Sequence, residues 1–276
     1  MLYDTQSRQV KISGDTMNYI EFGTGQNPLV ILPGLSDGLS PVGGRFQAIA
    51  LALTYKQFLR DYKVYIFSRK NHLEPGYSTR MMAKDQAEAM KAIGVSSAAV
   101  MGVSQGGMIA QFLAADYPKL VSKLVLVVTL AQANEIIQST VNEWIKFAKQ
   151  GDYKSLMLDT AERSYSDAYL RKYRFIYPLL GMFGKPKNFD RFIIEAMSCT
   201  KHNSYSELEK IVCPTFIIGG GQDKIVGPTS ALELAKEIRN CEIFVYEDYG
   251  HAVYEEVTDF NNRILHFLME KSYGEV

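Results

Sequence analysis

A serine with one glycine two positions before it and another two positions after it occurs twice in this chain. Either serine could supply a nucleophile. GVSQG at 102–106 and GLSDG at 34–38 both match the pattern Gly-x-Ser-x-Gly. A chance match is expected in roughly one chain in ten of this length, because glycine makes up about 7% of an average sequence. The residues around each copy therefore have to decide which serine does chemistry.

The residues around Ser104 have the pattern of a strand that runs directly into a helix. AAVMGV at 98–103 is apolar throughout, and QGGMIAQFLAA at 105–115 is amphipathic. A serine at such a junction lies on a sharp, strained turn, the nucleophile elbow, whose neighbours must be small. Gly102 and Gly106 meet this need, and the N–H groups at the helix start favour a developing negative charge. Ser104 is the predicted nucleophile.

Ser36 lies in a different kind of segment. It also follows an apolar run, but SDGLSPVGG at 36–44 contains Pro41 and three glycines. This composition predicts a loop and not a helix that starts at the serine. We therefore expect Ser36 not to be a nucleophile.

His251 is the histidine best placed to act as the base that a serine hydroxyl needs. It follows the last apolar run through EDYG at 247–250 and precedes the terminal helix. Residues at such a strand end gather at the site edge of an α/β sheet. The other three histidines are His72, His202 and His266.

Asp223 is the acid expected to orient the histidine ring. It follows TFIIGGGQ at 215–222 and so also stands at a strand end. Asp248 is the alternative, but a residue only three positions before His251 would have difficulty reaching Nδ1 from the far side of the ring. The chain order Ser104, Asp223, His251 is the one that accompanies a nucleophile elbow.

Short runs rich in Val, Ile and Leu alternate with helical periodicity along most of the chain, which predicts a doubly wound, mostly parallel α/β sheet. These runs are LVIL at 29–32, VYIF at 64–67, AAVMGV at 98–103, LVLVV at 124–128, TFIIG at 215–219 and EIFVY at 242–246. QVKIS at 9–13 and MNYIEFG at 17–23 alternate in polarity, as an antiparallel edge pair would. Ser230 and Glu233 have the spacing of a helix capping box.

Residues 131–205 break this alternation, because they contain no strand-like run. About 75 residues are too many for a loop, so we expect a helical cap inserted after the sixth strand, with residues 1–130 and 206–276 forming the core. The segment is rich in aromatic residues. We expect most of them to form a small core and a minority to face a pocket.

The overall composition and charge limit the classes of partner and site that we expect. Thirty basic and thirty acidic side chains cancel, with a pI near 6.9, so nothing favours nucleic acid or an anionic membrane as a partner. Three widely spaced cysteines without C-x-x-C predict neither a disulfide framework nor a metal site. We expect a cytoplasmic protein that acts on a small molecule without a cofactor; a homodimer is left open.

LVILPGL, GVSQGGMIAQFLAADYP, CPTFIIGGGQDKIV and the closing YGH together resemble the α/β-hydrolase family over essentially the whole chain. The resemblance implies an oxyanion hole made by the backbone N–H groups of Leu35 and Gln105, with GLSDG as the oxyanion loop. The chain departs from the family pattern at Pro33-Gly34, where the family often has His-Gly. It departs again at FSRKNHLEPG (67–76), where Asp-Arg-x-Gly is common.

The activity implied by this resemblance is hydrolysis of a small or medium, largely apolar carboxylic ester or lactone. Ser104 would attack the acyl carbonyl, with His251 as general base and then general acid. Carbon–carbon bond hydrolysis, acyl transfer and a slow-turnover receptor are alternatives. An aminopeptidase would need acidic cap residues, for which the candidates are Asp152, Asp159, Glu162 and Asp167. Relatives that need a carboxylate nucleophile are excluded by serine at position 104.

Overall fold

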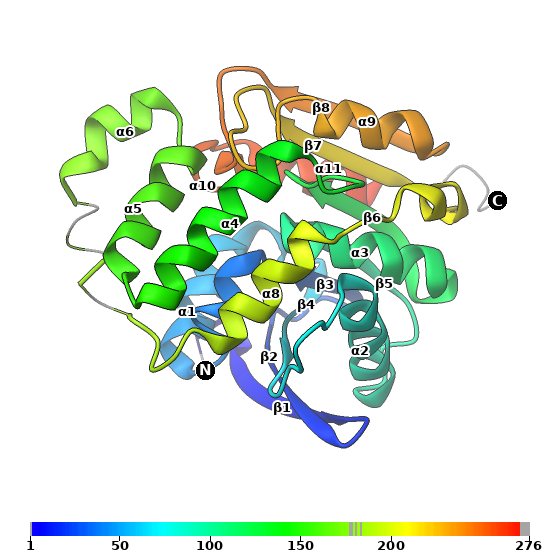
Figure 1. The fold of residues 1–276 in the computed structure, drawn as a ribbon. Coiled ribbons are helices and arrows are strands. Elements are labelled where there is room, and N and C mark those ends of the chain that lie inside the picture. Colours follow the sequence, from blue (N-terminus) through cyan, green and yellow to red (C-terminus); the bar gives the residue numbers. More distant parts are fainter. Residues whose placement is uncertain (1, 177–178, 180, 183, 271–276) are drawn as a thin grey trace.

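An eight-stranded, mostly parallel sheet forms the centre of the molecule (Figure 1). The computed structural model describes residues 2–176, 179, 181–182 and 184–270. The strands are β1 (Gln6–Ile12), β2 (Asp15–Phe22), β3 (Asn27–Leu32), β4 (Tyr62–Lys70), β5 (Ala98–Val103), β6 (Val121–Val127), β7 (Thr215–Gly220) and β8 (Cys241–Tyr246). Their order across the sheet is β1-β2-β4-β3-β5-β6-β7-β8.

The pairing directions match the expected fold class. β1 pairs antiparallel with β2, and β2 antiparallel with β4, while the neighbours from β4 to β8 all pair parallel. Every residue of β5 and β7 is buried, as expected for central strands covered on both faces. The doubly wound α/β fold predicted from the sequence is confirmed.

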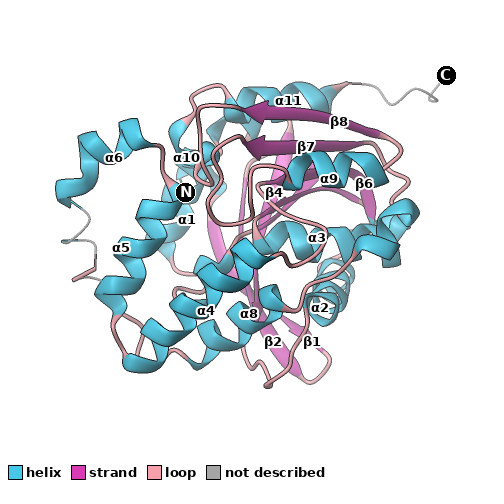
Figure 2. Cartoon of the chain, turned by 45° about the horizontal axis from the view of Figure 1, so that its top comes forward, coloured by secondary structure: helices cyan, strands magenta, loops and turns pink. Residues whose placement is uncertain are grey.

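Helices cover both faces of this sheet (Figure 2). α2 (Thr79–Ala92), α3 (Gln105–Asp116) and α9 (Ser230–Glu237) pack on one face. α1 (Arg45–Thr54) and α11 (Phe260–Met269) pack on the other. The short α10 (Val253–Glu256) precedes α11. Two apolar cores, one on each face, hold the sheet rigid beneath the site.

The carboxyl ends of the parallel strands meet at one edge of the sheet, and the loops that follow them carry the predicted site residues. β3 leads into the 3-10 turn η2 (Leu35–Gly38), and β5 leads directly into Ser104. β7 and β8 lead into the segments that carry Asp223 and His251. Residues far apart in the chain are thereby brought to a common edge.

Between β6 and β7, the described residues of the segment 131–205 form helices and no strand. These helices are α4 (Glu135–Gln150), α5 (Tyr153–Ser164), α6 (Asp167–Tyr173) and α8 (Asp190–Thr200). α4 packs against both α5 and α8, and Figure 1 shows the group beside the sheet. Backbone hydrogen bonds tie the two ends of the segment together, from Ala133 to His202 and from Ser204 to Ala131. We call residues 131–205 the cap; its exact boundaries as a domain remain a prediction.

Some aromatic residues of the cap form the expected small core, but others lie outside it. Trp144, Tyr153, Phe189 and Phe192 belong to a buried cluster, and Trp144 also lines the pocket described below. In a separate row of tyrosines along α6, the ring of Tyr165 stacks on that of Tyr169, and the ring of Tyr173 contacts Tyr169 at a tilt. Phe175 is exposed. Tyr177 and Phe183 lie outside the described residues.

The predicted capping box at Ser230 is wrong. The N-cap of α9 is Thr229, which makes no side-chain capping hydrogen bond. Its hydroxyl instead donates to the side chain of Glu233, while the Ser230 hydroxyl donates to Val226 O. Because Thr229 and Ser230 both carry a hydroxyl group, the sequence pattern did not determine which of them is the N-cap.

Candidate active site

His251 and Asp223 are hydrogen-bonded at the edge of the sheet. His251 Nδ1 lies 2.7 Å from Asp223 Oδ2, and both side chains are almost fully buried. The other carboxylate oxygen of Asp223 accepts the backbone N–H groups of Ile225 and Val226 at 2.8 and 2.9 Å. The carboxylate is therefore held from both sides and fixes the orientation of the ring. Asp248, the alternative partner, is exposed.

Ser104 has the backbone of a nucleophile elbow. Its φ of 54° and ψ of −118° lie in a region of backbone conformation that residues other than glycine rarely adopt. The glycines around it leave space that a side chain would fill. A Cβ on Gly102 would lie 2.4 Å from Gly106 O, and one on Gly106 would lie 1.9 Å from Leu32 O. The turn can close only because neither residue has a side chain.

Ser104 and His251 line the same pocket. Within the described chain, the Ser104 hydroxyl makes no hydrogen bond to the ring. In unliganded enzymes this contact is often long and shortens when substrate binds. The pocket is the region in which a reacting carbonyl would meet both groups.

Two backbone N–H groups near Ser104 belong to the first residues of helices. Leu35 is the first residue of η2 and Gln105 is the first residue of α3, so neither N–H has an acceptor in its own helix. η2 lies close to the nucleophile, because a Cβ on Gly34 would be 3.4 Å from Ser104 Cβ. This arrangement agrees with the implied oxyanion hole, and both residues remain candidates for that role.

The wall of the pocket combines the core with the cap. The pocket has a volume of about 100 Å³. Its apolar lining includes Met108, Ile137, Val141, Trp144 and Ile225. A second pocket adjoins it and shares Ser36, Thr160, Ser164 and Tyr254 with its lining. The two together could take a substrate on both sides of a scissile bond.

Cys199 also lines the first pocket, and sequence analysis did not consider it as a nucleophile. Burial raises the pKa of its thiol to about 12. The thiolate is the reactive form of cysteine, so this side chain is inert at neutral pH. The other two cysteines are also unpaired.

The remaining histidines lie apart from Ser104. His72 contacts Asp15 at the exposed end of the β1–β2 hairpin, and His266 contacts Glu270 on the last helix. His202 is buried, where it contacts the Thr79 hydroxyl. Burial lowers the pKa of His202 to about 3, so this ring stays neutral.

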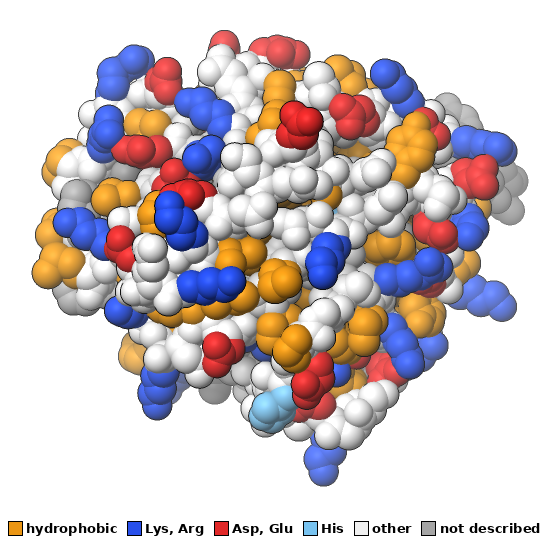
Figure 3. Space-filling model, in the orientation of Figure 1, with side chains coloured by type: hydrophobic (Ala, Val, Ile, Leu, Met, Phe, Trp, Pro, Cys, Tyr) orange, Lys and Arg blue, Asp and Glu red, His pale blue; other side chains and the backbone are white. Residues whose placement is uncertain are grey.

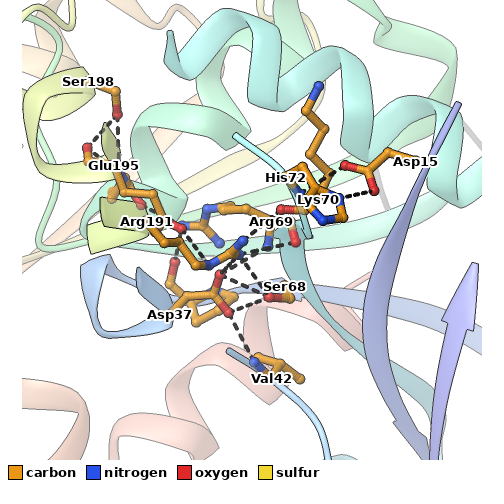
Figure 4. A network of polar contacts seen from close by, with 12 residues as sticks. Asp15, Asp37, Val42, Ser68, Arg69, Lys70, His72, Arg191, Glu195 and Ser198 are labelled. Carbon is orange, nitrogen blue, oxygen red and sulfur yellow. Dashed lines mark hydrogen bonds and ion pairs between the residues drawn. The ribbon is translucent and has the colours of Figure 1, made fainter. Parts of the chain in front are cut away.

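A buried polar network behind the site was missed by sequence analysis (Figure 4). Arg69 lies in the degraded motif FSRKNHLEPG, yet its guanidinium donates to Pro33 O at 2.6 Å and to Gln105 Oε1 at 2.9 Å. It thereby connects the residue before Gly34 with the first residue of α3. Arg69 is the arginine of the Asp-Arg-x-Gly pattern, and its presence in the degraded motif is the signal that could have identified it.

Charged residues are mixed on the surface. On the face shown in Figure 3, acidic and basic side chains are interspersed without a broad area of one sign. None of the described helices combines the length and apolarity needed to span a bilayer. Among the same residues, no group of three or more His, Cys, Asp or Glu is arranged to hold a metal ion.

Comparisons with curated proteins identify hydrolases among the relatives. The chain is 27% identical to the monoacylglycerol lipase abhd6-B of Xenopus laevis, over 57% of this chain and 50% of that protein. It therefore spans only half the length of this relative. It is 24% identical to the serine hydrolase BPHL of Mus musculus, over 94% of this chain and 84% of that protein.

A third relative is named for a different kind of substrate. The 2-hydroxy-6-oxononadienedioate/2-hydroxy-6-oxononatrienedioate hydrolase of Burkholderia vietnamiensis is 25% identical, with 91% of this chain and 90% of that protein covered. The relatives thus agree on hydrolysis but not on one substrate.

Solved structures and a family model agree on the fold. MGS-M2, an α/β hydrolase from a deep-sea metagenome of the Medee basin, superposes with a TM-score of 0.83 at 20% identity, covering 97% of this chain and 99% of that one. The enol-lactonase of Burkholderia xenovorans superposes with a TM-score of 0.77 at 18% identity, covering 95% and 100%. The family model of the alpha/beta hydrolase fold matches residues 27–257. The chain therefore belongs to the α/β hydrolase family.

Proposed function

We propose that this hydrolase cleaves small or medium carboxylic esters or lactones through an acyl-enzyme on Ser104. The observation that carries the proposal is the hydrogen bond between His251 and Asp223 at the wall of the pocket that Ser104 also lines. A serine hydroxyl needs such a base, and the base needs an orienting carboxylate.

The proposed reaction has two halves. His251 Nε2 accepts the hydroxyl proton as Ser104 attacks the acyl carbonyl, while Asp223 holds the proton on Nδ1. The N–H groups of Leu35 and Gln105 donate to the oxyanion. The imidazolium then protonates the leaving alkoxide, and a water molecule, deprotonated by the same ring, releases the acid.

The lining of the pocket supports an apolar acyl group. Five aliphatic or aromatic side chains from α3, α4 and the Asp223 loop surround the space next to Ser104. Burial of such a chain contributes about 0.8 kcal/mol per methylene group. We therefore expect kcat/KM to rise with acyl length until the pocket is filled.

Carbon–carbon bond hydrolysis is the second candidate, since a relative with that kind of substrate matches over nine tenths of the chain. The name of its substrate denotes a dicarboxylate. The described residues that line the pocket next to Ser104 include neither lysine nor arginine, so an anionic group would be bound there without a countercharge. This favours a neutral ester.

The aminopeptidase alternative loses its support from the cap. Asp152 caps α5 and Asp159 binds Trp144 Nε1 and Arg163. Glu162 pairs with Arg174, and Asp167 pairs with Lys224. These acids stabilise the cap instead of lining the pocket.

Labelling with a fluorophosphonate tests the proposal. Tryptic digestion separates Ser36, in the peptide 12–45, from Ser104, in the peptide 92–119. We expect the label on 92–119, assigned to Ser104 by fragmentation, and multiple turnover of p-nitrophenyl esters and simple lactones. A label on 12–45, or no label with turnover intact, would contradict the assignment.

A panel of substrates on the same sample separates the alternatives. Turnover of esters and lactones but not of vinylogous diketo acids is the expected result. Rapid cleavage of a diketo acid would favour the carbon–carbon hydrolase. A single slow burst with tight retention of the ligand would favour a receptor.

A further inference from the structure

The residue that follows the serine in each Gly-x-Ser-x-Gly pentapeptide is bound to the same cap helix, α8. Asp37, in the upstream copy, accepts a hydrogen bond from Arg191 Nη2 at 2.8 Å. Gln105, in the downstream copy, donates through Nε2 to Glu195 O at 2.8 Å and to Ser198 Oγ at 3.1 Å. Figure 4 shows Arg191, Glu195 and Ser198 of α8, with Arg191 directed toward Asp37. One helix of the cap thus holds both loops that carry the proposed oxyanion donors.

Arg191 is held rigidly in this position. Besides Asp37, its guanidinium donates to Lys70 O at 2.6 Å and to Arg69 O at 3.2 Å, at the end of β4. Its side chain is only 16% exposed, and that of Asp37 is fully buried. The arginine therefore connects three elements: the cap helix, the end of a central strand and the oxyanion loop.

Asp37 is in turn bound to the loop that it shapes. It accepts hydrogen bonds from Val42 N at 3.1 Å, Ser68 Oγ at 2.7 Å and Arg69 N at 3.0 Å. Burial alone would raise the pKa of this carboxyl, but the charges of Arg69 and Arg191 and the hydrogen bonds hold it below its ordinary value. Asp37 is thus an anion at the turn of η2, two residues after Leu35.

Close packing leaves α8 little freedom relative to η2. A Cβ on Gly38 would lie 2.8 Å from Phe192 Cα and 3.2 Å from Glu195 Oε2. The last glycine of the upstream pentapeptide is therefore required by the approach of the cap helix and not by a nucleophile. A shift of α8 would be transmitted directly to η2.

We propose that Arg191 is a positioning residue that sets the oxyanion hole through Asp37, so that the cap helix α8 and the two oxyanion donors act as one unit. The inference rests on the proposed function, because it takes Leu35 and Gln105 N–H as the donors. Such donors act when they lie 2.7–3.1 Å from the oxyanion. A displacement of about 1 Å can cost about 10²-fold in rate.

A purely structural ion pair would behave differently. Breaking a buried pair lowers stability whatever the pair does for catalysis. A positioning role also changes how the enzyme binds a charged tetrahedral species compared with a neutral ground-state ligand. The ratio of these two affinities separates the two roles.

The test compares Arg191→Gln with Arg174→Gln, a matched cap arginine whose partner, Glu162, is on the surface. For each variant, the thermal midpoint, kcat, KM and the inhibition constants of a trifluoromethyl ketone and of its unreactive alcohol analogue are measured. For Arg191→Gln we expect kcat and ketone affinity to fall together, by about 10²-fold, with KM and alcohol affinity little changed. Arg174→Gln is expected to behave as wild type.

The double variant Asp37→Asn/Arg191→Gln covers the case in which the single variant does not fold, because it removes both buried charges together. Its ketone-to-alcohol affinity ratio is also expected to fall. A folded variant of either kind that keeps the wild-type ratio would overturn the inference, even if its thermal midpoint drops.

The proposed function fails independently of this inference. If Ser104→Ala retains full turnover, the acyl-enzyme itself is wrong. If Ser104→Ala is inactive and unlabelled while Arg191→Gln keeps the ratio, only the role of Arg191 is wrong.

Discussion

The two Gly-x-Ser-x-Gly segments have the same pattern but use it for different purposes. In the downstream copy, the glycines let a strand turn directly into α3 with Ser104 at a φ of 54°. In the upstream copy, Gly34 lies beside Ser104 at an ordinary contact distance, while Gly38 allows α8 to approach η2. The pattern reports where backbones come close together. Both serines line the pocket that holds His251, and what distinguishes Ser104 from Ser36 is its position on the strained turn between β5 and α3.

The largest expected difference is between the two serines. Ser104→Ala should lower kcat by about 10⁶-fold, as loss of the nucleophile does in a serine hydrolase, while Ser36→Ala should keep most of the activity. Ser36 is exposed and lies in η2. Ester hydrolysis under saturating substrate measures the effect. Similar losses in both variants would remove the distinction between the two segments.

Replacing the glycines of the two segments by alanine should also have different effects on stability and activity. These effects should be smaller than the loss of activity in Ser104→Ala. Gly106→Ala places a Cβ against Leu32 O, and Gly38→Ala places a Cβ against the backbone of α8. Each substitution should therefore lower the free energy of unfolding by about 1–3 kcal/mol or more. Gly34→Ala meets Ser104 Cβ at an ordinary contact distance of 3.4 Å. It should keep its stability and lose activity, because the added methyl group occupies space beside the nucleophile.

Denaturant unfolding and kcat/KM of the three glycine variants, measured on the same preparations, sharpen the comparison. If Gly106→Ala were as stable as wild type, the close approach that defines the elbow would be wrong. If Gly34→Ala kept full activity, η2 would not lie against the reacting atoms.

The last expected effect concerns how stability depends on pH through Glu195, which lies between the two segments. Burial, reinforced by the charge of Asp37, raises the pKa of this carboxyl to about 8 from an ordinary 4.5. Neither of its side-chain oxygens accepts a hydrogen bond within the described chain, although Oε1 lies 3.1 Å from Arg191 Nε. The folded state therefore favours the protonated acid.

The sign of the pH dependence follows from this. Between pH 4.5 and 8 the folded state binds this proton more strongly than the unfolded state, so stability falls as pH rises through that window. The slope from this group is at most about 1.4 kcal/mol per pH unit. Glu195→Gln, which is neutral and similar in shape, should remove this slope.

Unfolding curves at several pH values between 4.5 and 8 measure the difference between wild type and Glu195→Gln. The surface variant Glu143→Gln is the control, since Glu143 pairs with Lys146 on the outside of α4. A wild type and a Glu195→Gln variant with parallel pH profiles would show that Glu195 is not held protonated by the fold.

The sequence alone determined the features that depend on neighbouring residues. β5 was predicted at 98–103 and has those bounds, because a short apolar run that ends at a turn is typical of a strand buried on both faces. The elbow at Ser104 was predicted from the glycines two positions away, which meet a local steric need. Where two neighbours could serve equally, as Thr229 and Ser230 could, local pattern was insufficient and the predicted cap was wrong.

Only the tertiary structure decided what holds the proposed site in place. Asp37 and Arg191 are 154 positions apart, and Gln105 and Glu195 are 90 apart. No periodicity or motif predicts that such residues meet, because their contact depends on how α8 packs over the edge of the sheet. A charged side chain on an amphipathic helix is usually solvated. Arg191 is instead the buried partner of a carboxylate, because α8 packs closely against Gly38.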